Sequence, residues 1–341
     1  MGRKTKMNSI TSPELLEQVN PENKRLLNDF LEYLHSVGRS DGTCEAYKSD
    51  IEIAFVWNYQ NNGNKFFVEW TKRNVMSYQN YLLNTNNNSP ARIRRLKASL
   101  SSLSNFIENI LDEEYPNFRN IINKIESPVN NPVREKTVFE DSELEDLLNT
   151  IMNKHRYEQA CFLALAMYGG RRKAELCRFK VSDFDDDKLV CDGALYKSAP
   201  IKTKGRGTQG KMLECYTLAK KFKPYFDAWM KYRDENGIDS EWLFPSDKYE
   251  SGHIEVPTAN SWAETFSRLT GKNFYWHSVR HFHVSALSRA GIPDSVVTEI
   301  LGWSTAEMFK IYNDNPKDEQ IGMYFKNGDI SVPEKKSFED M

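Results

Sequence analysis

The chain has 341 residues, which is long for one domain and sufficient for two domains that each bury a core. Its 46 basic and 48 acidic side chains give a net charge of −2, so composition alone does not indicate a nucleic-acid-binding protein, and any basic surface must be local. The five cysteines are scattered, and no stretch approaches the roughly 20 consecutive apolar residues of a membrane span. We therefore expect a cytoplasmic protein with neither a disulfide framework nor a membrane partner.

The first third of the chain predicts a helical domain. Residues 1–20 are polar, and we expect them to be flexible. Over residues 21–125, apolar side chains recur at helical spacing between turn-forming segments. The pattern predicts four helices, which span Pro21 to the residue before Gly38, Ser40 or Asp41 to the NNGNK run at 61–65, about 70–84, and Ser89 to at least Ile107.

Basic side chains cluster in the first turns of the last of these helices, at Arg92, Arg94, Arg95 and Lys97. One interpretation is a solvated helix face with charge pairs along the helix. However, no acidic residue is near them until Glu108. We therefore favour a surface that faces nucleic-acid phosphates.

A second domain is predicted after a linker. Residues 126–137 contain two prolines and two asparagines that interrupt any periodicity, as in a flexible linker. Residues 138–325 form the second domain, and residues 326–341 a C-terminal tail. The pattern predicts a mainly α fold with a small antiparallel β-sheet. The expected helices span Glu140–Met152, Tyr157–Tyr168, 219–236, 257–270, 277–290 and 293–302, and the expected strands lie within Val181–Lys202 and Met212–Leu218.

Four short motifs follow one another in the second domain: GGRRKAEL at 169–176, HSVRH at 277–281, LGWST at 301–305 and IYND at 311–314. Tyr312 stands nine residues after Trp303. Because a tyrosine has a pKa near ~10, it is a useful nucleophile at neutral pH only where cations stabilise the phenolate and the charge on the attacked group. The arginines, histidine and lysines of these motifs are the groups that phosphodiester chemistry would require.

The order of these motifs resembles that of the tyrosine recombinases, the family of phage integrases and of Xer- and Cre-like enzymes. That family has an Arg, a Lys on a β-hairpin, His-x-x-Arg, His or Trp, and then Tyr. The resemblance implies an N-terminal helical core-binding (SAM-like) domain over 21–125 and an α+β catalytic domain over 138–325. It also implies a site-specific recombinase that cleaves and rejoins DNA through a 3′-phosphotyrosyl intermediate, with no metal or other cofactor.

The resemblance also implies partners. The expected partner is a double-stranded DNA recombination site, on which four protomers assemble and exchange strands through a Holliday junction. An accessory DNA-bending or directionality factor would fit such a system. DNA integration by a phage or another mobile element, at the nucleoid of a prokaryotic cell, is the setting that the family suggests.

Roles for the motif residues are carried over from the family. Tyr312 would be the nucleophile, and Arg172 and Arg280 would hold the phosphate in two planar forks. His277 would act in proton transfer at the tyrosine or donate to the phosphate. Trp303 stands where most members have histidine, and its indole N–H can still donate one hydrogen bond.

Several assignments within the motifs leave alternatives open. Arg172 is chosen over Arg171 because it precedes the Glu175-Leu176 pair at the family's spacing, and Glu175 would orient it. Arg171 would then be a backbone-phosphate contact or simply exposed. His281 and His283 are expected to be structural. His277 and His281 have a spacing that zinc could use, yet no third ligand suggests itself, so no metal site is expected.

The general acid is expected on the hairpin turn. Lys202 is preferred, and Lys204 competes with it. Arg206 and Lys211 would contact phosphates or be solvated.

Two other kinds of protein share parts of this pattern. A type IB topoisomerase or a hairpin telomere resolvase uses similar chemistry, but the short chain and compact motifs favour a recombinase. A DNA-binding regulator with an inactive catalytic fold is the alternative outside the enzymes. The complete set of cationic residues together with Tyr312 argues against it.

Overall fold

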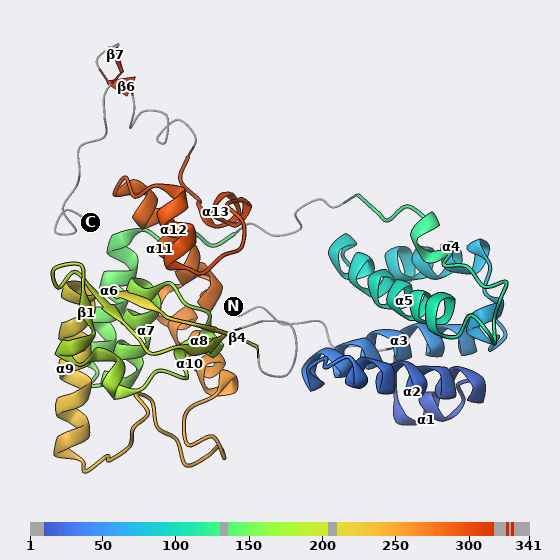
Figure 1. The fold of residues 1–341 in the computed structure, drawn as a ribbon, viewed down its shortest axis with the longest axis horizontal. Coiled ribbons are helices and arrows are strands. Elements are labelled where there is room, and N and C mark those ends of the chain that lie inside the picture. The colour runs from blue at the N-terminus through green and yellow to red at the C-terminus, as the bar shows by residue number, and fades with distance from the viewer. Residues whose placement is uncertain (1–9, 130–135, 204–209, 317–324, 327–328, 331–341) are drawn as a thin grey trace. The chain divides into compact units, whose positions relative to one another are not determined.

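The computed structural model describes residues 10–129, 136–203 and 210–316, together with the backbone of β6 (Phe325–Lys326) and β7 (Asp329–Ile330). These residues form two compact units, one before and one after the connecting segment near residue 135 (Figure 1). The predicted linker is described only in part, and most of the predicted C-terminal tail lies outside the described residues. Mainly helical structure with small antiparallel sheets confirms the predicted fold class.

The amino-terminal unit is a helical bundle whose long helices begin where the sequence indicated. Asn20 caps α2 and Ser89 caps α5 through their side-chain oxygens, and a proline follows each cap in the first turn. The apolar faces of the helices bury one shared core that includes Phe30, Trp57 and Leu100. The elements are α1 (Pro13–Glu17), α2 (Pro21–Ser36), α3 (Asp41–Asn61), η1 (Phe67–Glu69), α4 (Lys72–Asn80), η2 (Tyr81–Thr85), α5 (Pro90–Ile110) and η3 (Ile122–Lys124).

Two details of this unit differ from the predictions. Residues 10–20, expected to be flexible, contain α1, and Ile10 and Val19 are buried in the bundle core. The helix expected over 70–84 is α-helical only to Asn80 and then continues as the π-helical turn η2.

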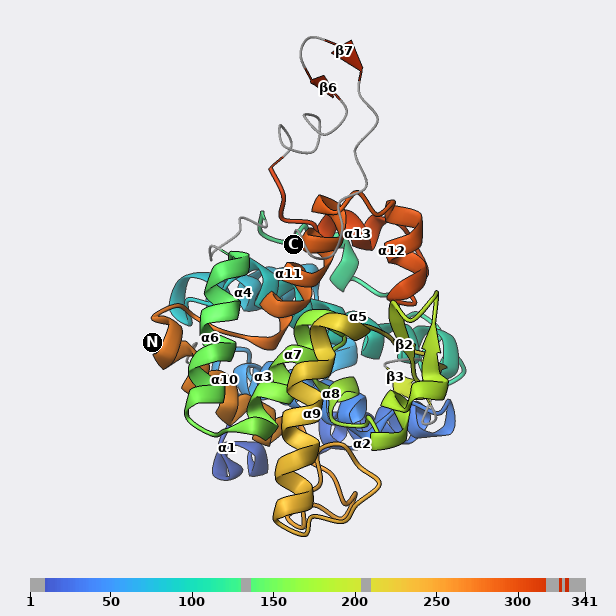
Figure 2. The same ribbon diagram turned by 90° about the vertical axis from the view of Figure 1, so that its left-hand side faces the viewer.

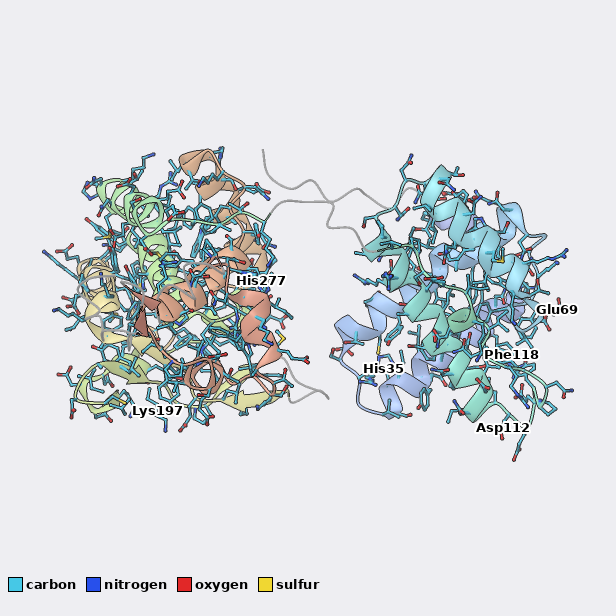
Figure 3. The ribbon with its side chains drawn as sticks, turned by 90° about the horizontal axis from the view of Figure 1, so that it is seen from above. His35, Glu69, Asp112, Phe118, Lys197 and His277 are labelled. Atoms are coloured by element: carbon cyan, nitrogen blue, oxygen red, sulfur yellow. The ribbon has the colours of Figure 1, made fainter. Side chains whose placement is uncertain are left out.

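The carboxy-terminal unit is built around α7, which is apolar on all sides. This helix packs against α6, α9 and α11 (Figure 2), and its side chains from Ala160 to Met167 are all buried. His277 in the first turn of α11 and Lys197 at the end of β2 lie at separate edges of the unit (Figure 3). The helices are α6 (Asp141–Asn153), α7 (Tyr157–Gly169), α8 (Lys173–Leu176), η4 (Val181–Phe184), η5 (Asp186–Lys188), α9 (Ala219–Glu235), α10 (Val256–Thr270), α11 (Trp276–Arg289), α12 (Asp294–Ile300) and α13 (Glu307–Tyr312).

Besides the antiparallel pair of β6 and β7, the described strands of this unit form two small antiparallel sheets. One has the order β1-β2-β5 and the other is the β3–β4 hairpin. The single strand expected over Met212–Leu218 is therefore two strands that pair with different partners. The break falls at Cys215, whose backbone exchanges hydrogen bonds with Ser198 instead of continuing the hairpin. The strands are β1 (Leu189–Val190), β2 (Leu195–Lys197), β3 (Ile201–Thr203), β4 (Lys211–Leu213) and β5 (Tyr216–Leu218).

No helix in the described part of the chain is both long and apolar enough to cross a membrane.

Candidate active site

Tyr312 meets the histidine predicted to act with it. The tyrosine ends α13, is 4% exposed, and its hydroxyl oxygen lies 2.8 Å from Nε2 of His277 at the start of α11. The tyrosine ring also stacks on Trp303, with centroids 5.1 Å apart and planes at 28°. Two residues 35 positions apart in the chain thus form the hydrogen bond that a tyrosine nucleophile and its proton acceptor require.

The surroundings of His277 keep its imidazole neutral. The residue is exposed at the surface of the unit, but the part of the ring that is shielded from water lowers its pKa to about 4, and the positive charges of neighbouring groups, including Arg280 and Arg172, act in the same direction. At neutral pH the ring is therefore uncharged, and Nε2 can accept the proton of the Tyr312 hydroxyl. It would lose this capacity only as the pH falls through about 4.

Arg280 is a buried cation with free donors. Its side chain is 1% exposed, and one terminal nitrogen, Nη1, donates to the carbonyl oxygen of Gly170 at 2.7 Å. Nε and Nη2 are buried and have no hydrogen-bond partner among the described residues. The guanidinium carbon lies 5.2 Å from the Trp303 ring centroid and 5.3 Å from that of Tyr312. Because a buried charge with unmet donors is costly, this arrangement suits an anionic ligand beside Tyr312.

Arg172 is held in place by the acidic residue three positions later. Its Nη1 donates to Oε1 of Glu175 at 3.0 Å, and its backbone N–H donates to Oε2 at 3.1 Å. Glu175 is 2% exposed, so this carboxylate is fixed within the fold. An orienting role for Glu175 would require such contacts.

Arg171 does not have the position predicted for it. It was expected to be exposed or to contact a phosphate, yet it is 2% exposed and donates to the carbonyl oxygen of Ile300 at 2.6 Å. The arginine therefore anchors the end of α12 and serves the fold. Gly170 before it has φ of +61°, and a Cβ there would lie 2.2 Å from Cδ2 of His283, so only glycine fits this turn.

Trp303 carries a second free donor next to Tyr312. Its indole Nε1 is buried and has no partner in the described ranges. The preceding Gly302 has φ of +63°, and a Cβ there would lie 2.5 Å from the Leu213 side chain, so this turn packs closely on β4. The hairpin that carries the candidate lysines is thereby in contact with the turn that presents the indole.

The hairpin lysines are described only in part. Lys202 is exposed on β3, and its stem carbons lie 3.4 Å from where a Cβ of Gly210 would be. Lys211 is exposed on β4 and is paired in register with Thr203. Lys204 and Arg206 lie outside the described residues.

His281 contacts a residue that the sequence analysis missed. Its Nδ1 lies 2.9 Å from Oδ2 of Asp314, and its ring centroid is 4.7 Å from that of Tyr312. Nothing in the sequence marked Asp314 except its place two residues after the tyrosine in the IYND motif. In the described part of the chain, no three histidine, cysteine, aspartate or glutamate side chains gather as a metal ligand set.

The basic cluster of α5 has an acidic partner that was not expected. Asp50 of α3 has a side chain only 2% exposed, and its carboxylate accepts from Arg92 at 2.7 Å and from Arg95 at 3.0 Å. Two cations share one anion, so a net positive charge remains at the surface. Lys97 was predicted wrongly as a phosphate-facing side chain. It is 5% exposed, and its ammonium donates to Gln79 and to the Ile125 carbonyl.

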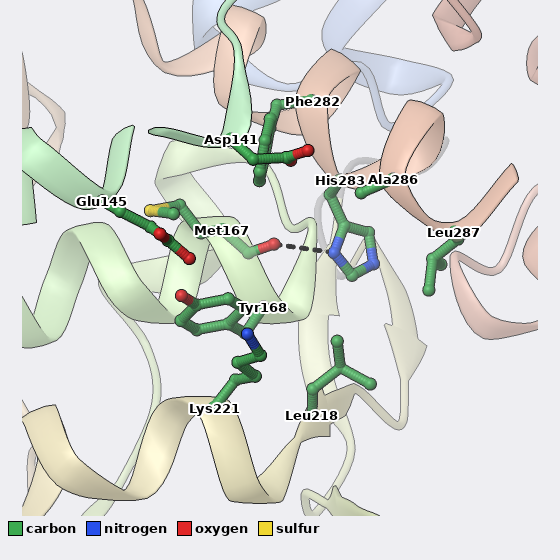
Figure 4. Close-up of a pocket in the computed structure, with 10 residues that line it drawn as sticks. All are labelled: Asp141, Glu145, Met167, Tyr168, Leu218, Lys221, Phe282, His283, Ala286 and Leu287. Atoms are coloured by element: carbon green, nitrogen blue, oxygen red, sulfur yellow. Dashed lines mark hydrogen bonds between the residues drawn. The ribbon is translucent and has the colours of Figure 1, made fainter. Parts of the chain in front are cut away.

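A pocket separate from this site lies between α6, α7, β5, α9 and α11 (Figure 4). Its volume is about 440 Å³, part of which is open to solvent. His283 lines it, and Nδ1 of this ring donates a hydrogen bond to the Met167 carbonyl oxygen at 2.8 Å. Burial lowers the pKa of His283 to about 4, so it is a neutral structural residue as predicted. None of the predicted catalytic residues lines the pocket.

Comparisons with known proteins agree with this geometry. Residues 137–319 match the phage integrase family, and residues 26–117 match its N-terminal SAM-like domain. The SPbeta prophage-derived recombinase-like protein YomM of Bacillus subtilis (strain 168) is 29% identical over 269 residues, which cover 78% of this chain and 76% of that protein. A tyrosine recombinase of Pseudothermotoga lettingae is 24% identical over 303 residues, covering 85% of this chain and 93% of that protein.

The fold is also found among solved structures. The XerH site-specific recombinase bound to palindromic difH substrate, in a post-cleavage complex, matches with a TM-score of 0.63 at 14% identity, over 90% of this chain and 97% of that chain. The family match covers more than half of the chain. The chain therefore belongs to the phage integrase family, the tyrosine-type site-specific recombinases.

Proposed function

We propose that Tyr312 of this recombinase attacks a DNA phosphodiester and forms a 3′-phosphotyrosyl bond. The observation that carries this proposal is the 2.8 Å contact between the Tyr312 hydroxyl and the neutral His277, beside the unmet donors of Arg280 and Trp303. A nucleophile, a proton acceptor and donors for the phosphate oxygens are thus within one site.

Each step can be assigned to a side chain. The Tyr312 proton passes to Nε2 of His277 as the phenolic oxygen bonds to phosphorus. Arg172, Arg280 and Trp303 stabilise the charge on the non-bridging oxygens. The bond from phosphorus to the 5′ oxygen breaks, and Lys202 gives a proton to that oxygen. The phosphotyrosyl bond retains the phosphodiester energy, so the reverse attack by a 5′ hydroxyl can rejoin a strand without ATP.

The wider assembly is part of the same proposal. Residues 21–125 would bind one part of a double-stranded recombination site, residues 126–137 would connect the units, and residues 138–325 would carry out catalysis. Four protomers would pair two sites and exchange strands through a Holliday junction, with an accessory factor where direction must be set. The setting would be the nucleoid of a prokaryotic cell, in the service of a phage or another mobile element.

A nicked DNA substrate tests the proposal and separates it from the alternatives. Cleavage beside the nick releases a short oligonucleotide, so the covalent protein–DNA complex accumulates. Trapping of the parent chain supports the enzyme, whereas binding without trapping would support the inactive regulator. Relaxation of supercoiled DNA without strand exchange, or closed hairpin ends, would favour the topoisomerase or telomere resolvase.

The general acid can be found by changing the leaving group. We expect Lys202→Ala to slow cleavage by about 10²-fold to 10⁴-fold, as is typical when general acid catalysis is lost. A 5′-thio leaving group departs without a proton, so it should restore the rate of this variant. Lys204→Ala is the matched comparison. If neither variant is rescued by the thio substrate, both assignments are wrong.

The salt dependence of binding tests the basic surface of α5. Replacing both exposed arginines, Arg94→Gln with Arg95→Gln, should lower the slope of log K against log salt by about two, because each lost phosphate contact releases about one counterion fewer. Lys97→Met is the control. Its ammonium is bound inside the unit, so it should reduce stability and leave the slope unchanged. An unchanged slope in the double variant would show that the basic cluster is a solvated helix face that does not contact DNA phosphates.

A further inference from the structure

Asp314 joins the segment after the nucleophile to two other parts of the catalytic unit. Its side chain is 10% exposed. Oδ2 lies 2.9 Å from Nδ1 of His281, and Oδ1 accepts from Nζ of Lys136 at 3.3 Å. Lys136 also donates to the carbonyl oxygen of Ile311, 175 positions later in the chain. The carboxylate that follows α13 therefore has two partners, His281 on α11 and Lys136 before α6.

The neighbours of Asp314 are fixed to α11 as well. The Asp314 backbone N–H donates to Oγ of Ser285 at 2.9 Å, and Nδ2 of Asn313 donates to Oγ of Ser288 at 3.1 Å. Nδ2 of Asn315 donates to the Ser285 carbonyl at 3.0 Å. The three residues after Tyr312 thus all bind α11, the helix whose first turn contains His277.

The charges at this junction are complementary. Burial alone would raise the pKa of the Asp314 carboxyl, but the adjacent His281 ring and the ammonium of Lys136 hold this pKa below its ordinary value. The carboxylate is therefore ionised at neutral pH. This carboxylate contacts the His281 ring, which lies beside Tyr312, and Lys136, which also donates to the backbone carbonyl of Ile311.

We propose that Asp314 is a positioning residue for the nucleophile, which together with His281 and Lys136 holds the Tyr312 hydroxyl at His277. This inference rests on the proposed role of Tyr312. Asp314 does not touch the reacting atoms in this geometry. It acts through α13 and α11, whose relative placement sets the 2.8 Å contact between the two catalytic side chains.

Single-turnover cleavage of the nicked substrate by the full chain tests the inference. Asp314→Asn keeps the shape and removes the charge, and we expect cleavage to slow by roughly 10-fold to 100-fold, since a misplacement of about 1 Å can cost a factor of this order. Lys136→Met should slow it by about two- to fivefold, as for the loss of a partly exposed ion pair. The affinity for uncleaved DNA should be unchanged in both. In the double variant the two effects should combine to less than their product, because Lys136 acts in part through that carboxylate and in part through the Ile311 carbonyl.

The pair Lys223 and Asp227 on α9 supplies matched controls. Their ion pair is 2.9 Å long and half-exposed, and Lys223→Met and Asp227→Asn should leave the cleavage rate unchanged. Cleavage by Asp314→Asn at the parent rate, or a double variant slowed by the full product of the two single effects, would overturn the positioning role. The parent chain is the control for the proposed function. If it forms the covalent complex through Tyr312, a result against the Asp314 network rules out only the positioning role, and the proposed function still holds.

Discussion

Tyr312→Phe is expected to abolish covalent attachment to DNA while leaving binding nearly intact. The substitution removes only the hydroxyl oxygen, which is the proposed nucleophilic atom and the atom that forms the hydrogen bond with His277. The ring would still stack on Trp303, and the cationic groups that bind phosphate are retained. Gel separation of covalent complexes on a nicked site measures the first effect, and a binding titration on intact DNA measures the second.

A matched tyrosine supplies the control for this experiment. Tyr275 is the N-cap of α11, two residues before His277, and the hydroxyl that lies at His277 is that of Tyr312. Tyr275→Phe should therefore trap DNA as the parent does. Trapping of Tyr312→Phe on the nicked site would mean that another residue is the nucleophile.

Much of the fold could be predicted because local patterns determine the helices. Apolar residues at helical spacing and the caps at Asn20 and Ser89 placed α2 and α5 within a few residues of their observed bounds. The strands were harder. Whether residues 211–218 form one strand or two depends on the bonds between Ser198 and Cys215, which are remote in sequence and leave no local signal.

The candidate site also contains features that the sequence predicted and features that it did not predict. The order and spacing of the motifs predicted which side chains would meet, and Tyr312, His277 and Arg280 do meet. The errors came from partners far along the chain. Arg171 is buried because it binds a carbonyl 129 residues away, and the arginines of α5 pair with Asp50, 42 and 45 residues before them. Sequence neighbours cannot reveal such contacts.

Replacement of Trp303 should also slow cleavage strongly. If its free indole N–H donates to the scissile phosphate, Trp303→Phe keeps an aromatic ring against Tyr312 and loses that bond. Loss of one donor to a transition state typically costs about 10²-fold to 10³-fold in rate. Single-turnover cleavage of the nicked substrate measures this directly.

Trp303→His separates the donor from the bulk of the ring. An imidazole N–H can supply a donor to the same phosphate, so this variant should retain substantially more activity than Trp303→Phe, although it loses part of the stacking surface on Tyr312. If packing alone mattered, the order would be reversed, because phenylalanine fills the site better than histidine. Equal cleavage by Trp303→Phe and the parent would make Trp303 a packing residue, and the phosphate would then be held by Arg172 and Arg280 without it.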